Sequence, residues 1–271
     1  MKAQEILDHF QSITHWVAPE DSVDRIIIGN PDKHVSRVGV TWMSTFENVR
    51  EAIAHGCDML VTHEPTFWVH ADELATVESW PEGSIKRQAA EHKRRFIERR
   101  GLVILRVHDA WDVMPDIGIP YAWARHLGLG DAPAARSANT FQHRYDIEPV
   151  TLDALARRIA RRTAELGEPA VQVIGPPDQL VSKIGIGTGC YCDLAVFQQL
   201  DCDLSIICDD SNWYWEGIAF AADNDHAVIR VNHGVSEEPG MITLAQYIND
   251  TLPITAEYIP HGAPFRLVGR S

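Results

Sequence analysis

The chain has 271 residues, with 24 Lys and Arg against 38 Asp and Glu, and a formal net charge of −14 at pH 7. Hydrophobic residues make up 45% of the chain and charged residues 23%, which is typical of a globular protein and excludes disorder for the chain as a whole. A chain of this length forms one large domain or two domains of modest size.

Targeting signals and cysteine usage predict a cytoplasmic protein. Residues 1–6 lack the apolar core of a signal peptide, and no apolar run reaches the ~18 residues that a membrane-spanning helix needs, so we expect no membrane contact. The five cysteines form an odd set without a CxxC pair, which is typical of a reducing compartment.

Negative charge is concentrated in residues 190–271, where 12 acidic residues accompany only three arginines. Such a surface repels nucleic acid, so we do not expect a nucleic-acid partner. Residues 86–100 form a basic run of helical pattern that mixes seven basic residues with two acids. We interpret it as a solvated, partly self-paired helix face; the alternative is a basic rim that attracts an anionic substrate.

Short runs rich in Val, Ile and Leu alternate with segments of helical pattern, which predicts an α/β protein with largely parallel sheets. Capping residues and glycines set the predicted helix ends. In chain order we expect a strand at 37–42, a helix at 44–56, a strand at 57–62, a helix at 84–100, a strand at 102–107, a helix at 120–127, a helix at 151–166, strands at 170–174 and 183–187, a helix from 190, strands at 204–208 and 227–232, a helix at 242–252 and a strand at 254–259. No repeat with a period of 20 to 50 residues is present.

Three of the predicted strands end on a histidine, and each histidine is followed closely by a carboxylate. In open α/β sheets ligands bind beyond the carboxyl ends of the strands, so these side chains converge if the strands are neighbours. The histidines are His63, His108 and His233, and the carboxylates are Glu64, Asp109, Asp112 and Glu237.

Histidine mixed with carboxylates suits Zn²⁺, Mn²⁺, Fe²⁺ or related ions, and no cysteine lies beside these positions to favour a structural zinc site. His233 and Glu237 have i, i+4 spacing, so they share a face if a helix begins there. Two ions bridged by a carboxylate is the simplest arrangement. The alternative is that each residue is structural: a hydrogen-bonded His at a strand end, or an acid at a turn or a helix N-terminus.

Other motifs are weaker candidates. The glycines of residues 185–189 lie between a strand and a helix, where they suit either a phosphate cradle or a tight turn. Cys190 and Cys192 are interpreted as buried helix packing. Asp209 and Asp210 follow a strand and are interpreted as helix N-terminal acids, and the aromatic run 213–215 as core or interface packing rather than a stacking surface.

Three short segments resemble the signatures of the NIF-three-like family of dinuclear metal proteins, also catalogued as type 2 GTP cyclohydrolase I. The segments are Val61-Thr62-His63-Glu64-Pro65, His108-Asp109-Ala110-Trp111-Asp112 and His233-Gly234-Val235-Ser236-Glu237. They are similar to a Thr-His-His-Pro, a His-Thr-Asn-Leu-Asp and a His-x-x-x-Glu of that family, in the same order. The resemblance covers nearly the whole chain.

The resemblance implies two divalent metal ions per chain, of the Zn, Mn or Fe type. His63, Asp112, His233 and Glu237 would bind them, with Glu237 or Asp112 bridging. Glu64 departs from the signature because the family has a second His there; a carboxylate still coordinates, but it favours harder ions such as Mn²⁺, Fe²⁺ or Mg²⁺. These five residues are the predicted metal ligands.

His108 matches a signature position for which we expect general acid/base or supporting duty rather than metal ligation.

The resemblance also implies the architecture and an activity. We expect two α/β domains with mixed, largely parallel sheets that face each other across a metal-containing cleft: residues 1–130 with 234–271, and residues 131–233. Family members are similar in assembling as toroidal homohexamers. The implied function is a metal-dependent hydrolase of a small anionic or nucleotide-like molecule, with ring opening of a purine nucleotide as one option. The alternative is a non-catalytic metal-binding, metal-delivery or regulatory interaction protein.

Overall fold

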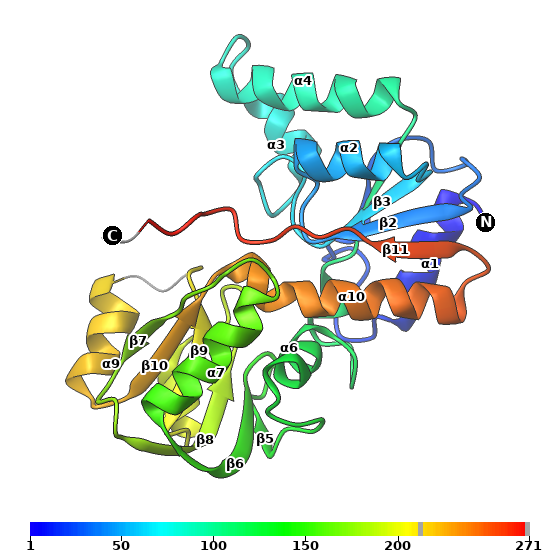
Figure 1. The fold of residues 1–271 in the computed structure, drawn as a ribbon. Helices are drawn as coiled ribbons and strands as arrows, with labels where there is room; N and C mark the ends of the chain where they lie inside the picture. Colours follow the sequence, from blue (N-terminus) through cyan, green and yellow to red (C-terminus); the bar gives the residue numbers. More distant parts are fainter. Residues whose placement is uncertain (211–213, 269–271) are drawn as a thin grey trace. The chain divides into compact units, whose positions relative to one another are not determined.

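The computed structural model describes residues 1–210 and 214–268 as a mixed α/β protein with two mixed sheets (Figure 1). The chain divides into two compact units. The first consists of Met1–Met114 and Met241–His261, and the second of Pro115–Gly240 with the described residues from Gly262 on. The predicted α/β class is therefore confirmed.

The first unit contains a five-stranded sheet of order β1-β4-β3-β2-β11, in which only β1 is antiparallel to its neighbour. Its strands are β1 (Arg25–Ile28), β2 (Arg37–Thr41), β3 (Met59–Thr62), β4 (Val103–Arg106) and β11 (Thr255–Tyr258). Its helices are α1 (Ala3–Ile13), α2 (Phe46–Ala54), α3 (Glu73–Ser79), α4 (Ile85–Arg99) and α5 (Asp109–Asp112).

The second unit contains a six-stranded sheet of order β5-β6-β8-β9-β10-β7, with β8, β9 and β10 parallel. Its strands are β5 (Ala135–Arg136), β6 (His143–Thr151), β7 (Gln172–Ile174), β8 (Leu180–Ile186), β9 (Leu204–Cys208) and β10 (Ala227–Val231). Its helices are α6 (Ile119–Leu127), α7 (Leu152–Ala164), α8 (Leu194–Gln199) and α9 (Ala219–Asp223), preceded by a π-helical turn η1 (Tyr214–Ile218). Helix α10 (His233–Thr251) begins in the second unit and ends in the first.

Capping side chains begin the helices where the sequence predicted them. Thr45, Ser84 and Thr151 each accept a hydrogen bond from a backbone N–H of the first turn of α2, α4 and α7. Gly128 ends α6 in the left-handed region, with φ 71°. These local signals are why the predicted bounds of α2, α4, α6 and α7 agree with the structure to within about two residues.

Two helix starts differ from the prediction. Helix α8 begins at Leu194 rather than at residue 190, because the Asp193 side chain caps it by accepting from Ala195 N at 2.9 Å. The two cysteines before it therefore do not pack as helix residues: Cys190 is exposed and Cys192 is buried in the preceding loop.

Helix α10 begins at His233, nine residues before the predicted start, and it continues through Pro239. Burial of apolar side chains such as Val235 and Leu244, both fully buried, outweighs the local cost of the proline.

Continuous apolar runs form the central strands because both faces of each sheet are covered. Every residue of β3, β4 and β9 is buried. Strands β3 and β4, which end just before His63 and His108, are thus buried up to their carboxyl ends, and in β10, which ends just before His233, only Arg230 is half-buried. None of the described helices is both long enough and apolar enough to cross a membrane. Trp213, in the predicted aromatic run, lies outside the described residues.

Candidate metal centre

His63 stands at the carboxyl end of β3 and is fully buried. The Trp42 carbonyl accepts both His63 N, at 3.0 Å, and Glu64 N, at 2.8 Å, which fixes the turn after the strand. The His63 Nδ1–H donates to the Val107 carbonyl at 3.4 Å, so Nε2 is the atom presented to the site. A backbone carbonyl at Nδ1 is the usual support for a metal-binding imidazole.

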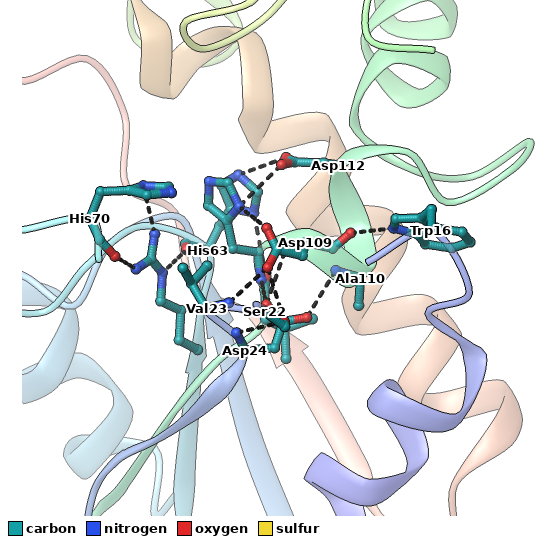
Figure 2. Close-up of polar contacts among 12 residues, drawn as sticks. Trp16, Ser22, Val23, Asp24, His63, His70, Asp109, Ala110 and Asp112 are labelled. Atoms are coloured by element: carbon teal, nitrogen blue, oxygen red, sulfur yellow. Dashed lines mark hydrogen bonds and ion pairs between the residues drawn. The ribbon is translucent and has the colours of Figure 1, made fainter. Parts of the chain in front are cut away.

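Asp112 presents one oxygen to each of two stacked imidazole rings. Its Oδ1 lies 3.3 Å from His63 Nε2, and its Oδ2 lies 3.1 Å from His108 Nδ1. The rings of His63 and His108 lie 4.3 Å apart and nearly parallel, at 11°. The i, i+4 spacing of His108 and Asp112 across α5 makes this geometry possible (Figure 2).

Glu64 also belongs to this group. A carboxylate oxygen of Glu64 and a ring nitrogen each of His63 and His108 all lie within 4.8 Å of one another. A second set with the same spacing consists of His108, Asp109 and Asp112. Three of the five predicted metal ligands therefore lie together in the first unit.

Asp24 holds the backbone turn that begins at His108 and leads to Asp112 (Figure 2). Its carboxylate accepts from three successive backbone N–H groups: His108 at 2.6 Å, Asp109 at 2.9 Å and Ala110 at 2.9 Å. Burial raises the pKa of Asp24 to about 6, although these hydrogen bonds oppose the shift. Asp24 precedes β1, and no sequence signal singled it out.

Asp109 anchors the N-terminal segment to the same turn. Its Oδ2 accepts from Ser22 Oγ at 2.9 Å and from Val23 N at 2.8 Å, while its carbonyl accepts from Trp16 Nε1 at 2.7 Å. Burial alone would raise the pKa of Asp109, but hydrogen bonds from His108, Val23 and Ser22 outweigh it and hold this pKa well below its usual range. Asp109 therefore acts as a structural anion.

The pKa of His108 is set by burial acting against its carboxylate neighbours. Burial lowers the pKa of His108, but the charge of Asp112 and hydrogen bonds to Asp109 and Asp112 outweigh burial and raise it well above its usual value. The His108 Nδ1–H faces Asp112 Oδ2 at 3.1 Å and Asp109 Oδ1 at 3.3 Å. This position fits the acid/base or supporting duty expected for it.

Arg106 and His70 complete the first unit's site, and sequence reasoning did not identify either of them. The fully buried Arg106 donates to the carbonyls of His63 at 3.1 Å and His70 at 2.5 Å. Its Nη2 also donates to His70 Nδ1 at 3.1 Å, so the neutral His70 ring carries its proton on Nε2. The His70 ring meets His108 edge-on, with centroids 4.8 Å apart.

The second unit carries the other predicted pair. His233 opens α10, and its Nε2 lies 3.0 Å from Glu237 Oε1 one turn later. Asp209 Oδ1 accepts from His233 N at 2.7 Å, and Asp210 Oδ2 lies 3.7 Å from His233 Nδ1. The acids after β9 thus lie at the N-terminus of α10, and they orient its first residue.

The glycine loop after β8 is explained by close packing. A Cβ on Gly187 would lie 2.5 Å from the Tyr191 carbonyl, so the tight-turn interpretation accounts for this glycine. Gly189 has φ 54°, and a Cβ there would lie 3.4 Å from both His233 Nε2 and Glu237 Oε1. Gly189 therefore leaves room beside the His233–Glu237 pair.

Both His–carboxylate pairs fit a bound divalent ion. Two ligand atoms at about 2.1 Å from one ion lie roughly 3.0–3.4 Å apart in octahedral or tetrahedral geometry. The separations of 3.3 Å for His63 with Asp112 and 3.0 Å for His233 with Glu237 agree with that spacing. Nitrogen with carboxylate oxygen is also the donor set that Zn²⁺, Mn²⁺ and Fe²⁺ accept.

Comparisons with known proteins agree on one family. The sequence model described as Duf34/NIF3 (NGG1p interacting factor 3) matches residues 1–260. A curated relative from Chlamydia pneumoniae, named "GTP cyclohydrolase 1 type 2 homolog", is 22% identical over 271 residues, which cover 98% of this chain and all of the relative.

Solved structures share the fold. A Staphylococcus aureus protein, SA1388, matches with a TM-score of 0.76 and 19% identity over 99% of both chains. A Bacillus cereus protein related to NIF3 matches with a TM-score of 0.73 and 16% identity, again over 99% of both chains. Reduced HcgD from Methanocaldococcus jannaschii matches with a TM-score of 0.69 and 15% identity over 95% of this chain and 97% of that one.

Proposed function

The chain belongs to the Duf34/NIF3 family, and on that premise we propose that it binds two divalent metal ions and hydrolyses a small anionic or nucleotide-like molecule. The proposed ligands are His63, Glu64, Asp112, His233 and Glu237. Bound cations of this type polarise an electrophilic carbon or phosphorus centre and make water a stronger nucleophile near neutral pH.

One observation carries the proposal: each unit presents a histidine and a carboxylate at ligand spacing, and in each unit another carboxylate holds the turn that leads to the carboxylate of the pair. His63 with Asp112 and His233 with Glu237 are the two pairs. Structural residues at strand ends do not require a carboxylate aimed at the imidazole of each one. Asp112 and Glu237 are also 13% and 3% exposed at the side chain, so neither is simply a solvated surface acid.

The residues of the chain supply proton transfer and orientation. His108 holds a proton at Nδ1 against Asp112 Oδ2, and we propose that it exchanges this proton with the reacting group as general acid/base. His70 presents its Nε2–H beside His108, where it is suited to donate a hydrogen bond to a substrate oxygen.

The substrate class follows from charge and from the relatives. Metal cations attract anionic groups to a chain whose own net charge is −14, which favours a phosphate- or carboxylate-bearing molecule. The name of the curated relative makes ring opening of a purine nucleotide one candidate reaction. Family resemblance further leads us to propose a homohexamer.

A metal-loaded turnover assay tests the proposal. Protein loaded with Mn²⁺, Fe²⁺ or Zn²⁺ is incubated with GTP and a panel of nucleotides and small cyclic amides, and products are separated by liquid chromatography. We expect metal-dependent hydrolysis that falls at least ~100-fold in Asp112→Asn and is unchanged in Asp116→Asn, an exposed acid four residues further on. Metal binding without turnover of any compound would contradict a hydrolase and favour a metal-binding or regulatory role.

A further inference from the structure

Two segments 146 residues apart have closely similar sequences. Residues 29–40 read Gly-Asn-Pro-Asp-Lys-His-Val-Ser-Arg-Val-Gly-Val, and residues 175–186 read Gly-Pro-Pro-Asp-Gln-Leu-Val-Ser-Lys-Ile-Gly-Ile. Six of the twelve positions are identical, and three more exchange Arg for Lys or Val for Ile. The first segment leads into β2 and the second into β8.

The strand arrangements around the two segments correspond as well. The order β1-β4-β3-β2 in the first unit has its counterpart in β7-β10-β9-β8 in the second, with the first strand of each series antiparallel and the others parallel. Gly29 and Gly175 both have positive φ, 106° and 119°. A Cβ on either would crowd the first residue of the same strand in each series, Val103 of β4 or Ala227 of β10.

Hydrogen bonds at the amino ends of the strands confirm the correspondence residue by residue. Asp58 Oδ2 accepts from Ser36 N, Ser36 Oγ and Arg37 N at 2.8–3.1 Å. Asp203 Oδ2 accepts from Ser182 N, Ser182 Oγ and Lys183 N at 2.8–3.0 Å. The two units therefore repeat one folding pattern.

Strand pairing extends the correspondence to the carboxyl ends, where the candidate metal ligands lie. Arg106 pairs with Arg25 of β1, and Arg230 pairs with Gln172 of β7, so the two arginines occupy equivalent positions. In each unit the residue two positions after this arginine begins the turn that carries the site. These residues are His108 and Asn232.

A carboxylate holds that turn at the same backbone atom in both units. Asp24 accepts from His108 N at 2.6 Å, and Glu168 accepts from Asn232 N with both oxygens, at 2.9 and 3.1 Å. Asp24 lies just before β1, and Glu168 lies four residues before β7. Neither Asp24 nor Glu168 is among the predicted metal ligands. Each contacts the site by accepting hydrogen bonds from the backbone N–H groups of the turn.

We propose that Asp24 and Glu168 are equivalent positioning residues of a duplicated fold, each fixing the turn that leads to the carboxylate of one His–carboxylate pair and orients it toward a divalent cation. This inference rests on the proposed metal-binding function. The turn held by Asp24 leads to Asp112, and the turn held by Glu168 leads to His233 and Glu237. Loss of a supporting hydrogen bond at a metal site typically weakens metal affinity 10–100-fold.

The test is Mn²⁺ titration calorimetry of the full-length protein and four variants. Asp24→Asn and Glu168→Gln keep the side-chain shape but replace an accepting oxygen with an NH₂ group that opposes the backbone N–H. Asp58→Asn and Asp203→Asn make the same chemical change at the opposite ends of the strands, so they are matched controls. Circular dichroism melting of all five proteins measures the stability change of each.

We expect Asp24→Asn and Glu168→Gln each to weaken Mn²⁺ binding at least tenfold at one class of site, while both controls stay within about twofold of wild type. If the wild type binds Mn²⁺ and Asp24→Asn and Glu168→Gln bind it with the same affinity, this inference is overturned but the proposed function is not. The inference is also overturned if all four variants lose Mn²⁺ affinity in proportion to their loss of melting temperature, because that result indicates general destabilisation. Absence of Mn²⁺ binding by the wild type overturns both this inference and the proposed function.

Discussion

Glu64 is the predicted metal ligand at which this chain departs from the signature that it resembles, and it lies in the group of ligand atoms with His63 and His108. A carboxylate is a harder ligand than an imidazole, so it favours Mn²⁺, Fe²⁺ and Mg²⁺ over Zn²⁺. We predict that Glu64→His shifts selectivity toward Zn²⁺, raising the ratio of Zn²⁺ to Mn²⁺ affinity at least about tenfold. Competition titrations of the two ions against a chromophoric chelator measure that ratio.

Glu64→Gln is the matched control, because it keeps the shape of the side chain and removes its charge. Glu64→Gln is expected to weaken the binding of both ions without reversing the order of their affinities. An unchanged ratio in Glu64→His would show that Glu64 does not ligate metal, and it would leave His63 and Asp112 as the ligands of the first unit.

His143 gives a pH dependence that is separate from the metal site. Burial lowers the pKa of His143 to about 4, and the neutral ring donates Nε2–H to the Thr140 carbonyl at 3.0 Å. In the unfolded chain the pKa is about 6.5, so between pH 6.5 and 4 the unfolded chain binds more protons than the folded protein. Falling pH therefore removes stability across this window, by up to about 3 kcal/mol.

We predict that wild type loses roughly 5–10 °C more in melting temperature between pH 7 and 4.5 than His143→Gln does. The exposed His34 provides the control substitution, His34→Gln, which should retain the wild-type pH dependence. Equal losses in wild type and His143→Gln would contradict a neutral, buried His143.

The segment between β3 and β4 supports the loop that carries His63. Helix α3 contributes Glu73, whose Oε2 accepts from Phe67 N at 2.7 Å, and α4 contributes Lys93, which donates to the Thr66 carbonyl at 2.7 Å. Burial lowers the pKa of Lys93 to about 8. Arg106 joins this buried network, with Nη1 3.8 Å from Glu73 Oε1. The role of residues 70–100 therefore includes anchoring the loop after His63.

We predict that Arg106→Met lowers the free energy of unfolding by about 3–5 kcal/mol, because it removes an ion partner of the buried Glu73 carboxylate and the Arg106 Nε–H that donates to the His63 carbonyl. The equivalent Arg230 is only partly buried and donates to Gln172 Oε1 at 2.8 Å. Arg230→Met should therefore lower the free energy of unfolding by at most about 1 kcal/mol. Thermal melting compares the two variants. Equal losses would contradict the buried network as the source of the difference.

Local signals predicted most elements, and tertiary contacts decided the others. Helix α4 was predicted from its cap and its charge pattern, and its arginines pair along one face as expected: Arg87 and Arg95 with Glu91, and Arg94 with Glu98. The start of α10 was not predicted, because the acids that cap it follow β9, far away in the sequence.

At the scale of the whole molecule, the strand-end histidines predicted which residues carry the candidate site. The supporting carboxylates were not predictable, because Asp24 and Glu168 precede short strands and bind only backbone. The duplicated pattern also shows where the units diverge. By strand register Cys208 occupies the position equivalent to His63, so the second unit draws its histidine from the turn after β10 instead.

The assembly predicted by family resemblance is a homohexamer. Light scattering coupled to size exclusion should give a mass of six times the 30.3 kDa chain. A monomeric mass across the accessible concentration range would contradict this expectation.

The most direct test of the central claim is elemental analysis by inductively coupled plasma mass spectrometry. Wild-type protein loaded with Mn²⁺, Fe²⁺ or Zn²⁺ and then desalted is compared with Glu64→Ala and Asp112→Ala. The account predicts about two ions per chain in the wild type and fewer in both variants. A wild-type protein that retains none of the three metals would contradict it.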